Sequence, residues 1–300
     1  MASIICGSWA IDTILNFEGN FADQILPDQI HKLNVSFFTP VMRREYGGCA
    51  GNIAYGLHQL GGVALPMAAC GPDTRDYLER FAKMGIDTSL VMVRPDNYTA
   101  LCTIMTDKQN NQITSFHPGA MGEAHLNEIK PRADAKLGII APDGRDAMWV
   151  HAHQFKAAGV PFIFDPGQQL PVFKGEEHRE LIAIADYVAV NDYEGALLSE
   201  RTGWSLADIS KHVKGLVVTL GEHGCDVWTD GQKTTVAPVK AAAVVDPTGC
   251  GDAFRAALLF GIEKGWDLVR CCTLGNQVGA IKIAHRGGQN YTLDLAVLGL

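Results

Sequence analysis

Short apolar runs alternate with helical patterns along most of this chain, and this alternation limits the fold more than any other feature. The runs have the length of buried strands: Ser3–Cys6, Val63–Cys70, Pro161–Gly167, Asp186–Asn191 and Gly215–Gly221. The other stretches repeat apolar residues at helical spacing: Gly48–Leu60, Arg75–Gly85, Arg179–Asp186, Asp252–Lys264 and Asp267–Ala284. This order predicts an α/β fold in which helices cover both faces of a mostly parallel sheet.

Ligands in such sheets bind beyond the carboxyl ends of the strands. The polar residues that follow the apolar runs are therefore the first candidates for a functional site: Asp12, Asp165, Asn191, Thr219 and the loop DPTGCGD that begins at Asp246. We expect them to lie at one edge of the sheet.

Residues 37–46 and 99–117 carry strand-like patterns that break the alternation. In the second stretch a polar DKQNNQ turn separates TALCTIMT from ITSFH, which predicts a hairpin. We expect a single domain over residues 1–300, with a small β lid formed by inserted segments at about 13–46 and 96–118.

Composition excludes several classes of protein. A chain of 300 residues with 47% hydrophobic content can bury a large core, and its net charge of −8 argues against nucleic-acid binding. The eight cysteines are scattered and form no CxxC pair, which favours reduced thiols over disulfides or structural zinc. The first apolar run lacks the features of a signal peptide and is too short to span a bilayer, so we expect a cytoplasmic protein without membrane contact.

Two histidines, His151 and His153, alternate in a stretch that we expect to be a strand. Alternation in a strand would place both side chains on one face. Two histidines alone do not make a metal site, so we expect a core or cleft role for them.

The loop DPTGCGDAF, Asp246–Phe254, directly precedes a helical pattern. The amides of Gly249, Cys250 and Gly251 would lie among the unpaired donors at the helix N-terminus, where the helix dipole favours an anion such as phosphate. Asp252 would lie at the same helix end, where its carboxylate could accept a proton from an attacking hydroxyl. The alternative is that Thr248 or Asp252 only caps the helix.

Other phosphate-binding designs are missing from the sequence. It contains no Gly-Lys dipeptide, which excludes a standard P-loop, and neither the HRD nor the DFG motif of protein kinases. The GxGxxG pattern of dinucleotide-binding folds is also absent. An anion site at Asp246–Phe254 would therefore belong to a different family.

Two stretches in this order resemble the two signatures of the PfkB, or ribokinase-like, family of sugar and nucleoside kinases. DPTGCGDAF is similar to the second signature, and GGCAGNIAYGLHQLGG, Gly47–Gly62, to the first. Gly71–Val91, the NDYE stretch at Asn191–Glu194 and TLGEHG at Thr219–Gly224 also match, so the resemblance covers essentially the whole chain. It implies a ribokinase-like three-layer sandwich. Cys250 stands where many members have Ala, which leaves the loop amides accessible.

The resemblance also implies roles for individual residues. Asp252 would be the general base, and the amides of Gly249, Cys250 and Gly251 would stabilise charge on the transferred phosphoryl group. The acceptor would bind at Asp12, Gly48 and Asn52, and ATP at Asn191, Thr219, Gly221, Gly224 and Asn276. Asn191 and Glu194 would organise Mg²⁺, mainly through water, and Asp246 and Thr248 are candidates for a monovalent cation such as K⁺.

Each implied role has a structural alternative. Asn191 and Glu194 could be a strand end and a first-turn acid, and Asn52 could be an ordinary residue at a helix start. The glycines after Thr219 could simply form turns. Arg255 could meet a phosphate or make a packing contact.

The acceptor is suggested by a weaker resemblance. FHPGAM, Phe116–Met121, and the form GCGDAFR are similar to prokaryotic nucleoside kinases of the adenosine-kinase type, which implies transfer from ATP to the 5′-hydroxyl of a ribonucleoside, as in purine salvage. Phe116 could stack on a base and His117 could hydrogen-bond to it, although a lid strand also needs apolar residues for its own packing.

Three readings therefore stay open: a nucleoside kinase, a sugar or sugar-phosphate kinase of the same family, and a non-catalytic small-molecule-binding protein. A sugar-phosphate kinase would need positive charge in the lid, which Arg43 and Arg44 could supply, although neighbours in a strand face opposite ways. The expected state is a monomer or homodimer.

Overall fold

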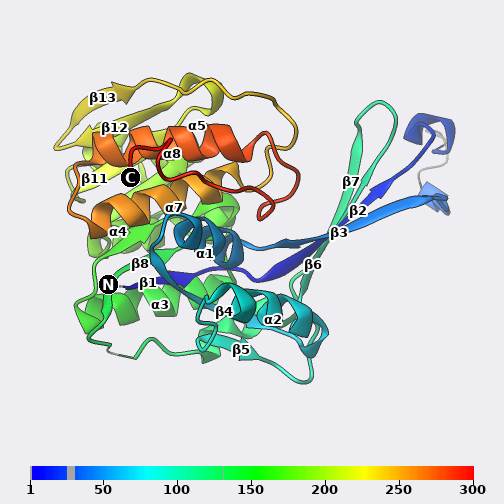
Figure 1. Cartoon of the computed structure of the whole chain (residues 1–300), viewed down its shortest axis with the longest axis horizontal. Coiled ribbons are helices and arrows are strands. Elements are labelled where there is room, and N and C mark those ends of the chain that lie inside the picture. The colour runs from blue at the N-terminus through cyan, green and yellow to red at the C-terminus, as the bar shows by residue number, and fades with distance from the viewer. Residues whose placement is uncertain (1, 26–30, 131) are drawn as a thin grey trace.

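The computed structural model describes residues 2–25, 31–130 and 132–300. Within these residues the chain forms a nine-stranded sheet in the order β13-β12-β11-β10-β9-β8-β1-β4-β5 (Figure 1). Neighbouring strands pair in parallel from β11 to β5, and β12 and β13 add an antiparallel edge. The expected α/β fold is confirmed, and the antiparallel edge is an addition that the strand pattern did not predict. The strands are β1 (Ala2–Cys6), β4 (Val63–Cys70), β5 (Val91–Val93), β8 (Ala135–Ile140), β9 (Phe162–Phe164), β10 (Tyr187–Asn191), β11 (Gly215–Thr219), β12 (Cys225–Thr229) and β13 (Gln232–Val236).

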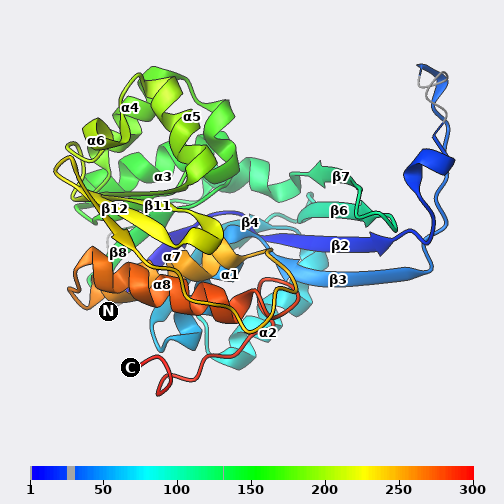
Figure 2. The same cartoon turned by 90° about the horizontal axis from the view of Figure 1, so that it is seen from above.

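Helices cover both faces of this sheet (Figure 2). One layer contains α1 (Cys49–Gln59), α2 (Arg75–Met84), α7 (Cys250–Glu263) and α8 (Leu268–Lys282). The other contains α3 (Arg145–Ala158), α4 (Gly175–Ile184), α5 (Asp192–Thr202) and the short α6 (Leu206–Ile209). Short 3-10 turns complete the chain: η1 (Phe21–Asp23), η3 (Pro72–Thr74), η4 (Gly119–Leu126), η5 (Gly167–Val172) and η6 (Gly221–His223).

The sheet is buried on both faces because its strands are apolar on both sides. In β1, Ile5 packs into the core under α1, α7 and α8, whereas its neighbour Ile4 packs into the core under α3, α4 and α5. Successive side chains of a strand point to opposite faces, so one continuous apolar run supplies both cores. In this packing α1 lies beside α7 on one face of the sheet.

A separate four-stranded sheet projects from the body (Figure 1) in the order β3-β2-β6-β7. Its strands are β2 (Ala10–Asn16), β3 (Val41–Gly47), β6 (Ala100–Thr106) and β7 (Gln112–His117). The expected hairpin is formed by β6 and β7, which pair antiparallel. The sheet comes from the two segments expected to form a lid, of which residues 26–30 lie outside the described part; its action as a lid stays a prediction.

The strand predicted around His151 and His153 is wrong, because both residues lie in the helix α3. Residues two apart in a helix point to nearly opposite sides. His151 is buried and contacts the carbonyl of Asn127 through Nε2, whereas His153 is more exposed and contacts Glu180 through Nε2. Among the described residues, no group of three or more His, Cys, Asp or Glu side chains could hold a metal ion.

No helix in the described ranges combines the length and the apolar character needed to cross a membrane. All eight cysteines are free thiols.

Candidate active site

The loop around Gly249 leads directly into α7, as the sequence predicts. Gly249 precedes the helix with a φ of 78°, in the left-handed region that favours glycine. A Cβ atom at this position would lie 2.9 Å from the Cα of Gly288. Of the three expected loop amides, that of Cys250 donates to the carbonyl of Pro247 at 3.1 Å. Gly249 is therefore needed both for the turn and for the close approach of a second loop.

Asp252 lies in the first turn of α7 and is held by Asn52 of α1. The Nδ2 of Asn52 donates to the Oδ2 of Asp252 at 2.8 Å. The pKa of Asp252 is raised to about 6, mainly by burial and also by the charge of Asp165, against the lowering effects of the bond from Asn52 and the charge of Arg255. A carboxylate with such a pKa is ionised at neutral pH and can accept a proton.

A chain of donors behind Asn52 fixes the direction of its amide. The Nε2 of Gln289 donates to the Oδ1 of Asn52 at 3.0 Å, and Arg80 donates to the Oε1 of Gln289 at 2.7 Å. Because the oxygen of Asn52 faces Gln289, its NH₂ group faces Asp252. Gln289 is buried and also contacts the hydroxyl of Tyr77. Sequence reasoning missed Gln289 and Arg80, which carry no local signal of a shared role.

Asp12 lies in β2, at the base of the small sheet and within electrostatic reach of Asp252. Its pKa is raised to about 6, mainly by burial and also by the charges of Asp252, Glu45 and Asp246. Gly47 leaves room for its carboxylate, since a Cβ atom there would lie 2.6 Å from the Oδ2 of Asp12. The structure thus brings Asp12 and Asp252 to one site.

Gly48 is the residue that joins β3 to α1. Its φ is 84°, and a side chain there would collide with the carbonyl oxygen of Ser8. The hydroxyl of Ser8 accepts a hydrogen bond from the amide of Cys49 at 3.0 Å. Gly48 is therefore needed for the turn that places Asn52 one helical turn later.

The register of the small sheet decides which of its side chains accompany Asp12. Asp12 pairs with Glu45 on one side and with Cys102 on the other, and Cys102 pairs with Phe116. Laterally paired residues share a face, so Phe116 lies on the face of Asp12 with 48% of its surface exposed. His117, the next residue, lies on the opposite face, and the structure does not bring it to Asp12.

Asn191 and Glu194 close the start of α5 with reciprocal hydrogen bonds. The amide of Glu194 donates to the Oδ1 of Asn191 at 2.7 Å, and the amide of Asn191 donates to the Oε2 of Glu194 at 2.8 Å. Burial raises the pKa of Glu194, and the charge of Asp165 contributes. The capping alternative is therefore realised, and it uses only one of the two carboxylate oxygens of Glu194. The role of these residues at a magnesium ion stays a prediction.

Arg255 forms a buried ion pair instead of facing the loop amides. Its Nε and one terminal nitrogen each lie 3.1 Å from an oxygen of Asp165, and both side chains are almost fully buried. Arg255 follows Asp252 by three residues and so lies one helical turn below it. The two charges of this pair act on the candidate base Asp252 in opposite directions, since Asp165 raises its pKa and Arg255 lowers it.

The residues expected to bind ATP come from four elements, β10, β11, η6 and α8. Parallel pairing places Asn191 next to Thr219 at the ends of β10 and β11. Gly221 and Gly224 bound the short turn η6, each with a positive φ, and Asn276 of α8 donates to the carbonyl of Ala237 at 2.8 Å. Thr219 and Asn191 thus meet at one sheet edge, and the two glycines shape the turn beside them.

Asp246 joins the loop before α7 to the segment after α8. Its Oδ1 accepts from the amide of Thr248 at 2.9 Å and its Oδ2 from the amide of Gly287 at 2.9 Å. Its carbonyl accepts from the ammonium of Lys282 at 2.7 Å. The position expected for a monovalent cation therefore adjoins a positive side chain.

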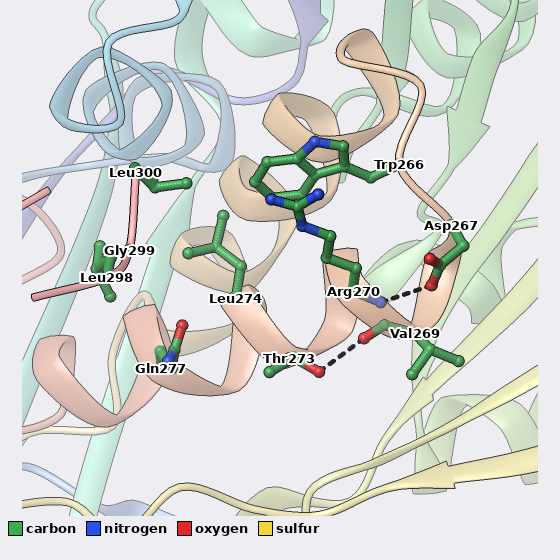
Figure 3. Close-up of a pocket in the computed structure, with 10 residues that line it drawn as sticks. All are labelled: Trp266, Asp267, Val269, Arg270, Thr273, Leu274, Gln277, Leu298, Gly299 and Leu300. Atoms are coloured by element: carbon green, nitrogen blue, oxygen red, sulfur yellow. Dashed lines mark hydrogen bonds between the residues drawn. The ribbon is translucent and has the colours of Figure 1, made fainter. Parts of the chain in front are cut away.

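A pocket of about 390 Å³ lies elsewhere and is lined mainly by α8 and the last three residues of the chain (Figure 3). In it the guanidinium of Arg270 lies 3.7 Å from the ring centroid of Trp266. The other lining residues are Asp267, Val269, Thr273, Leu274, Gln277, Leu298, Gly299 and Leu300. Trp266 lies beyond the end of α7, whereas Asp252 lies in its first turn, and the helix from Asp252 to its last residue Glu263 is about 16 Å long. This pocket contains none of the expected site residues.

Known proteins share both the sequence and the fold of this chain. The family model for pfkB family carbohydrate kinases matches residues 21–294. A nucleoside kinase of Burkholderia thailandensis, solved in complex with inosine, is 47% identical with a TM-score of 0.88, covering 99% of this chain and 95% of that one. Its complex with ADP-inosine gives 49% identity, a TM-score of 0.86 and coverage of 99% and 93%.

A nucleoside kinase of Methanocaldococcus jannaschii is 31% identical over 293 residues, which cover 96% of this chain and 93% of that protein. The solved structure of the nucleoside kinase from that organism, described as an archaeal member of the ribokinase family, gives a TM-score of 0.89 at 28% identity and covers 100% of this chain and 97% of that one. The fold, the two signature stretches and these matches agree: the chain belongs to the pfkB family of carbohydrate kinases, and is a phosphotransferase with an alcohol acceptor.

Proposed function

We propose that this enzyme transfers the γ-phosphate of ATP to the 5′-hydroxyl of a ribonucleoside, giving a nucleoside monophosphate and ADP. The observation that carries the proposal is the position of Asp252. Its carboxylate lies at the N-terminus of α7, is oriented by Asn52, and shares a site with Asp12 of the small sheet. The site thus combines a base, an anion-binding helix end and an acceptor for hydroxyl groups.

In the reaction, the acceptor oxygen forms a bond to the γ-phosphorus while the bond between that phosphorus and the bridging oxygen of ADP breaks. Asp252 accepts the proton of the attacking hydroxyl. The amides of Gly249 and Gly251 stabilise the charge that gathers on the transferred phosphoryl group, helped by the helix dipole, whereas the amide of Cys250 donates to the carbonyl of Pro247. A positioned base contributes about 10² to 10⁴-fold to the rate.

Asn191 and Glu194 are the residues proposed to organise Mg²⁺ through its water shell. When bound, this ion neutralises charge on the phosphate oxygens. Glu194 suits the role because its mutual bond with Asn191 uses only one carboxylate oxygen and holds the side chain at the strand end. Thr219 pairs with Asn191 in the sheet, and this supports a role for it beside the nucleotide phosphates.

The charge of the site favours an acceptor without a phosphate group. Asp12 and Glu45 lie side by side on the acceptor face, and both raise the cost of bringing another anion there. Arg43 shares that face, whereas Arg44 lies on the other, so only one of the two arginines could meet an acceptor phosphate. A nucleoside offers ribose hydroxyls to Asp12 and a flat base to Phe116.

The relatives agree with this choice, since the similar Burkholderia thailandensis enzyme is solved with inosine and with ADP-inosine. A sugar kinase of the same family is the second candidate, because the hydroxyl-binding residue Asp12 does not depend on a base. We also propose that the enzyme works in the cytoplasm, where ATP and nucleosides meet.

The test is ADP release from MgATP with adenosine, inosine, guanosine, cytidine, ribose, fructose or fructose 6-phosphate, each against a blank without acceptor. Turnover with nucleosides supports the proposal, and turnover with sugars alone contradicts the nucleoside assignment. In Asp252→Asn, kcat should fall by about 10² to 10⁴-fold, whereas Asp230→Asn, at an exposed hairpin position, should not change it. Unchanged turnover in Asp252→Asn would refute the assigned base.

A further inference from the structure

Lys282, the last residue of α8, is fully buried. Its ammonium donates to the carbonyl of Asp246 at 2.7 Å and to the carbonyl of His285 at 3.2 Å. Lysine is almost never fully buried unless its charge is compensated, because removing an ammonium from water is costly. Apolar packing alone therefore does not account for a buried ammonium that donates to backbone oxygens beside the loop Asp246–Phe254.

The two carbonyls belong to two different loops. Asp246 begins the loop that leads into α7, and His285 lies in the segment that follows α8. Further bonds join these loops, from the amide of Asp246 to the carbonyl of Ile283 at 3.1 Å and from the amide of Gly287 to the Oδ2 of Asp246 at 2.9 Å. The ammonium thus lies at a junction that holds the catalytic loop in place.

Gly249, directly before α7, is a residue at which the loop after α8 contacts the catalytic loop. The loop after α8 passes so close to Gly249 that a Cβ atom there would lie 2.9 Å from the Cα of Gly288. The position of the second loop therefore sets the position of the amides at the start of α7. A shift of either loop would move those amides away from the transferred phosphoryl group.

The surrounding charges favour a cation at this point. Burial lowers the pKa of Lys282 below its usual value, and the electrostatic effects of Cys250, Asp246 and Asp252 offset part of that lowering. Against the effect of burial, hydrogen bonds from the amides of Gly287 and Thr248 hold the pKa of Asp246 low, and the charge of Lys282 contributes. An ammonium and a potassium ion carry the same charge and both bind carbonyl oxygens.

We propose that Lys282 serves as a built-in monovalent cation for the phosphoryl-transfer loop, so that this kinase does not need K⁺. This inference rests on the proposed kinase function and assigns Lys282 as a positioning residue. Its ammonium binds the carbonyl of Asp246, one of the two residues expected to hold a free cation. Being tethered, it holds the loop at any salt composition.

The first test uses the unmodified enzyme. At constant ionic strength, kcat with the best acceptor is measured in KCl, NaCl and choline chloride. We expect the same kcat in all three salts. A severalfold activation by KCl over choline chloride would overturn the proposal, and this test does not depend on the folding of any variant.

The second test removes the ammonium in Lys282→Met, with Lys282→Gln as the alternative if the first variant does not fold. Loss of an electrostatic contribution to the loop should lower kcat by about tenfold or more, with little change in the KM of the nucleoside. KCl and NH₄Cl should restore part of the lost kcat, whereas choline chloride should not. Lys83→Met, at an exposed lysine in the last turn of α2, is the matched control and should behave as the unmodified enzyme.

A third readout needs no acceptor and separates this inference from the proposed function. Melting temperatures are measured in KCl and in choline chloride. KCl should raise the Tm of Lys282→Met but not that of the unmodified enzyme or of Lys83→Met. Full kcat of Lys282→Met without K⁺ would overturn the proposal. A loss that neither K⁺ nor NH₄⁺ restores, with no Tm response, would also overturn it, since Lys282 would then be merely structural.

Discussion

The hydrogen bond from Asn52 to Asp252 should control the pH at which the enzyme becomes active. The Nδ2 of Asn52 lies 2.8 Å from the Oδ2 of Asp252 and stabilises the ionised carboxylate. Asp252 works as a base only when ionised, so activity should rise as the pH passes its pKa of about 6. In Asn52→Ala the ionised form loses this support, and the pKa should move upward.

The size of the shift follows from the strength of the bond. A hydrogen bond to a charged group contributes about 1.5–3 kcal/mol, and about 1.36 kcal/mol corresponds to one pKa unit, so the pKa should rise by about one to two units. The acid limb would then lie at about pH 7–8. At pH 7 the ionised fraction of Asp252 would fall from about nine-tenths to about a quarter for a pKa near 7.5.

The assay is the pH dependence of kcat/KM, which reports the pKa of groups in the free enzyme. Asn52 is also expected to bind the acceptor, so the variant should show a higher KM at every pH. The midpoint of the acid limb separates the two effects, because lost acceptor binding lowers the curve without moving its midpoint. Asn276→Ala, which removes a different side-chain amide donor, should leave the midpoint in place. An unchanged midpoint in Asn52→Ala would refute the assignment of Asp252 as the titrating base held by Asn52.

Three further perturbations test other parts of the site. Gly249→Ala should cost about 1–2 kcal/mol of folding free energy because of its left-handed backbone, and it should also lower kcat. Gly265→Ala, with a φ of 72° and no atom within 4 Å of the added Cβ, should lose only the stability. Equal kcat in the two variants would contradict the close approach of the second loop to Gly249. Arg255→Met leaves a buried carboxylate unpaired and should lower the free energy of unfolding by about 3–5 kcal/mol in urea titrations, and a loss below about 1 kcal/mol would contradict it. Phe116→Ala should raise the KM of nucleosides by about fivefold or more, since stacking on a base contributes about 1–3 kcal/mol. His117→Ala, on the opposite face, should not change this KM. Equal effects of the two variants would show that the strand register does not decide which residue meets the base.

The sequence by itself determined the fold class and the local geometry of the catalytic loop. Strand and helix patterns depend on spacings of two to four residues, so they can be read along the chain. The position of Asp252 in the first turn of a helix is equally local, because the two glycines before it and the apolar spacing after it define that helix start. The family resemblance rests on such short stretches, and the matches to known kinases confirmed it.

The limit of local reasoning is visible in α3 and β7. His151 and His153 were expected on one face of a strand, but burial of Met148, Ala152 and Phe155 against the sheet selects a helix. The separation of Phe116 from His117 depends on strand register, which only the pairing with β6 fixes.

Tertiary structure alone decided which distant residues support the reacting groups. Gln289 meets Asn52 across 237 positions of the chain, Arg255 meets Asp165 across 90, and Lys282 meets Asp246 across 36. Each of these contacts forms because the sheet and its helices bring the residues together, and nothing in their local sequence encodes the partner. The chain order therefore specified the base and its helix, whereas packing supplied the donors and charges that set its pKa and hold its loop.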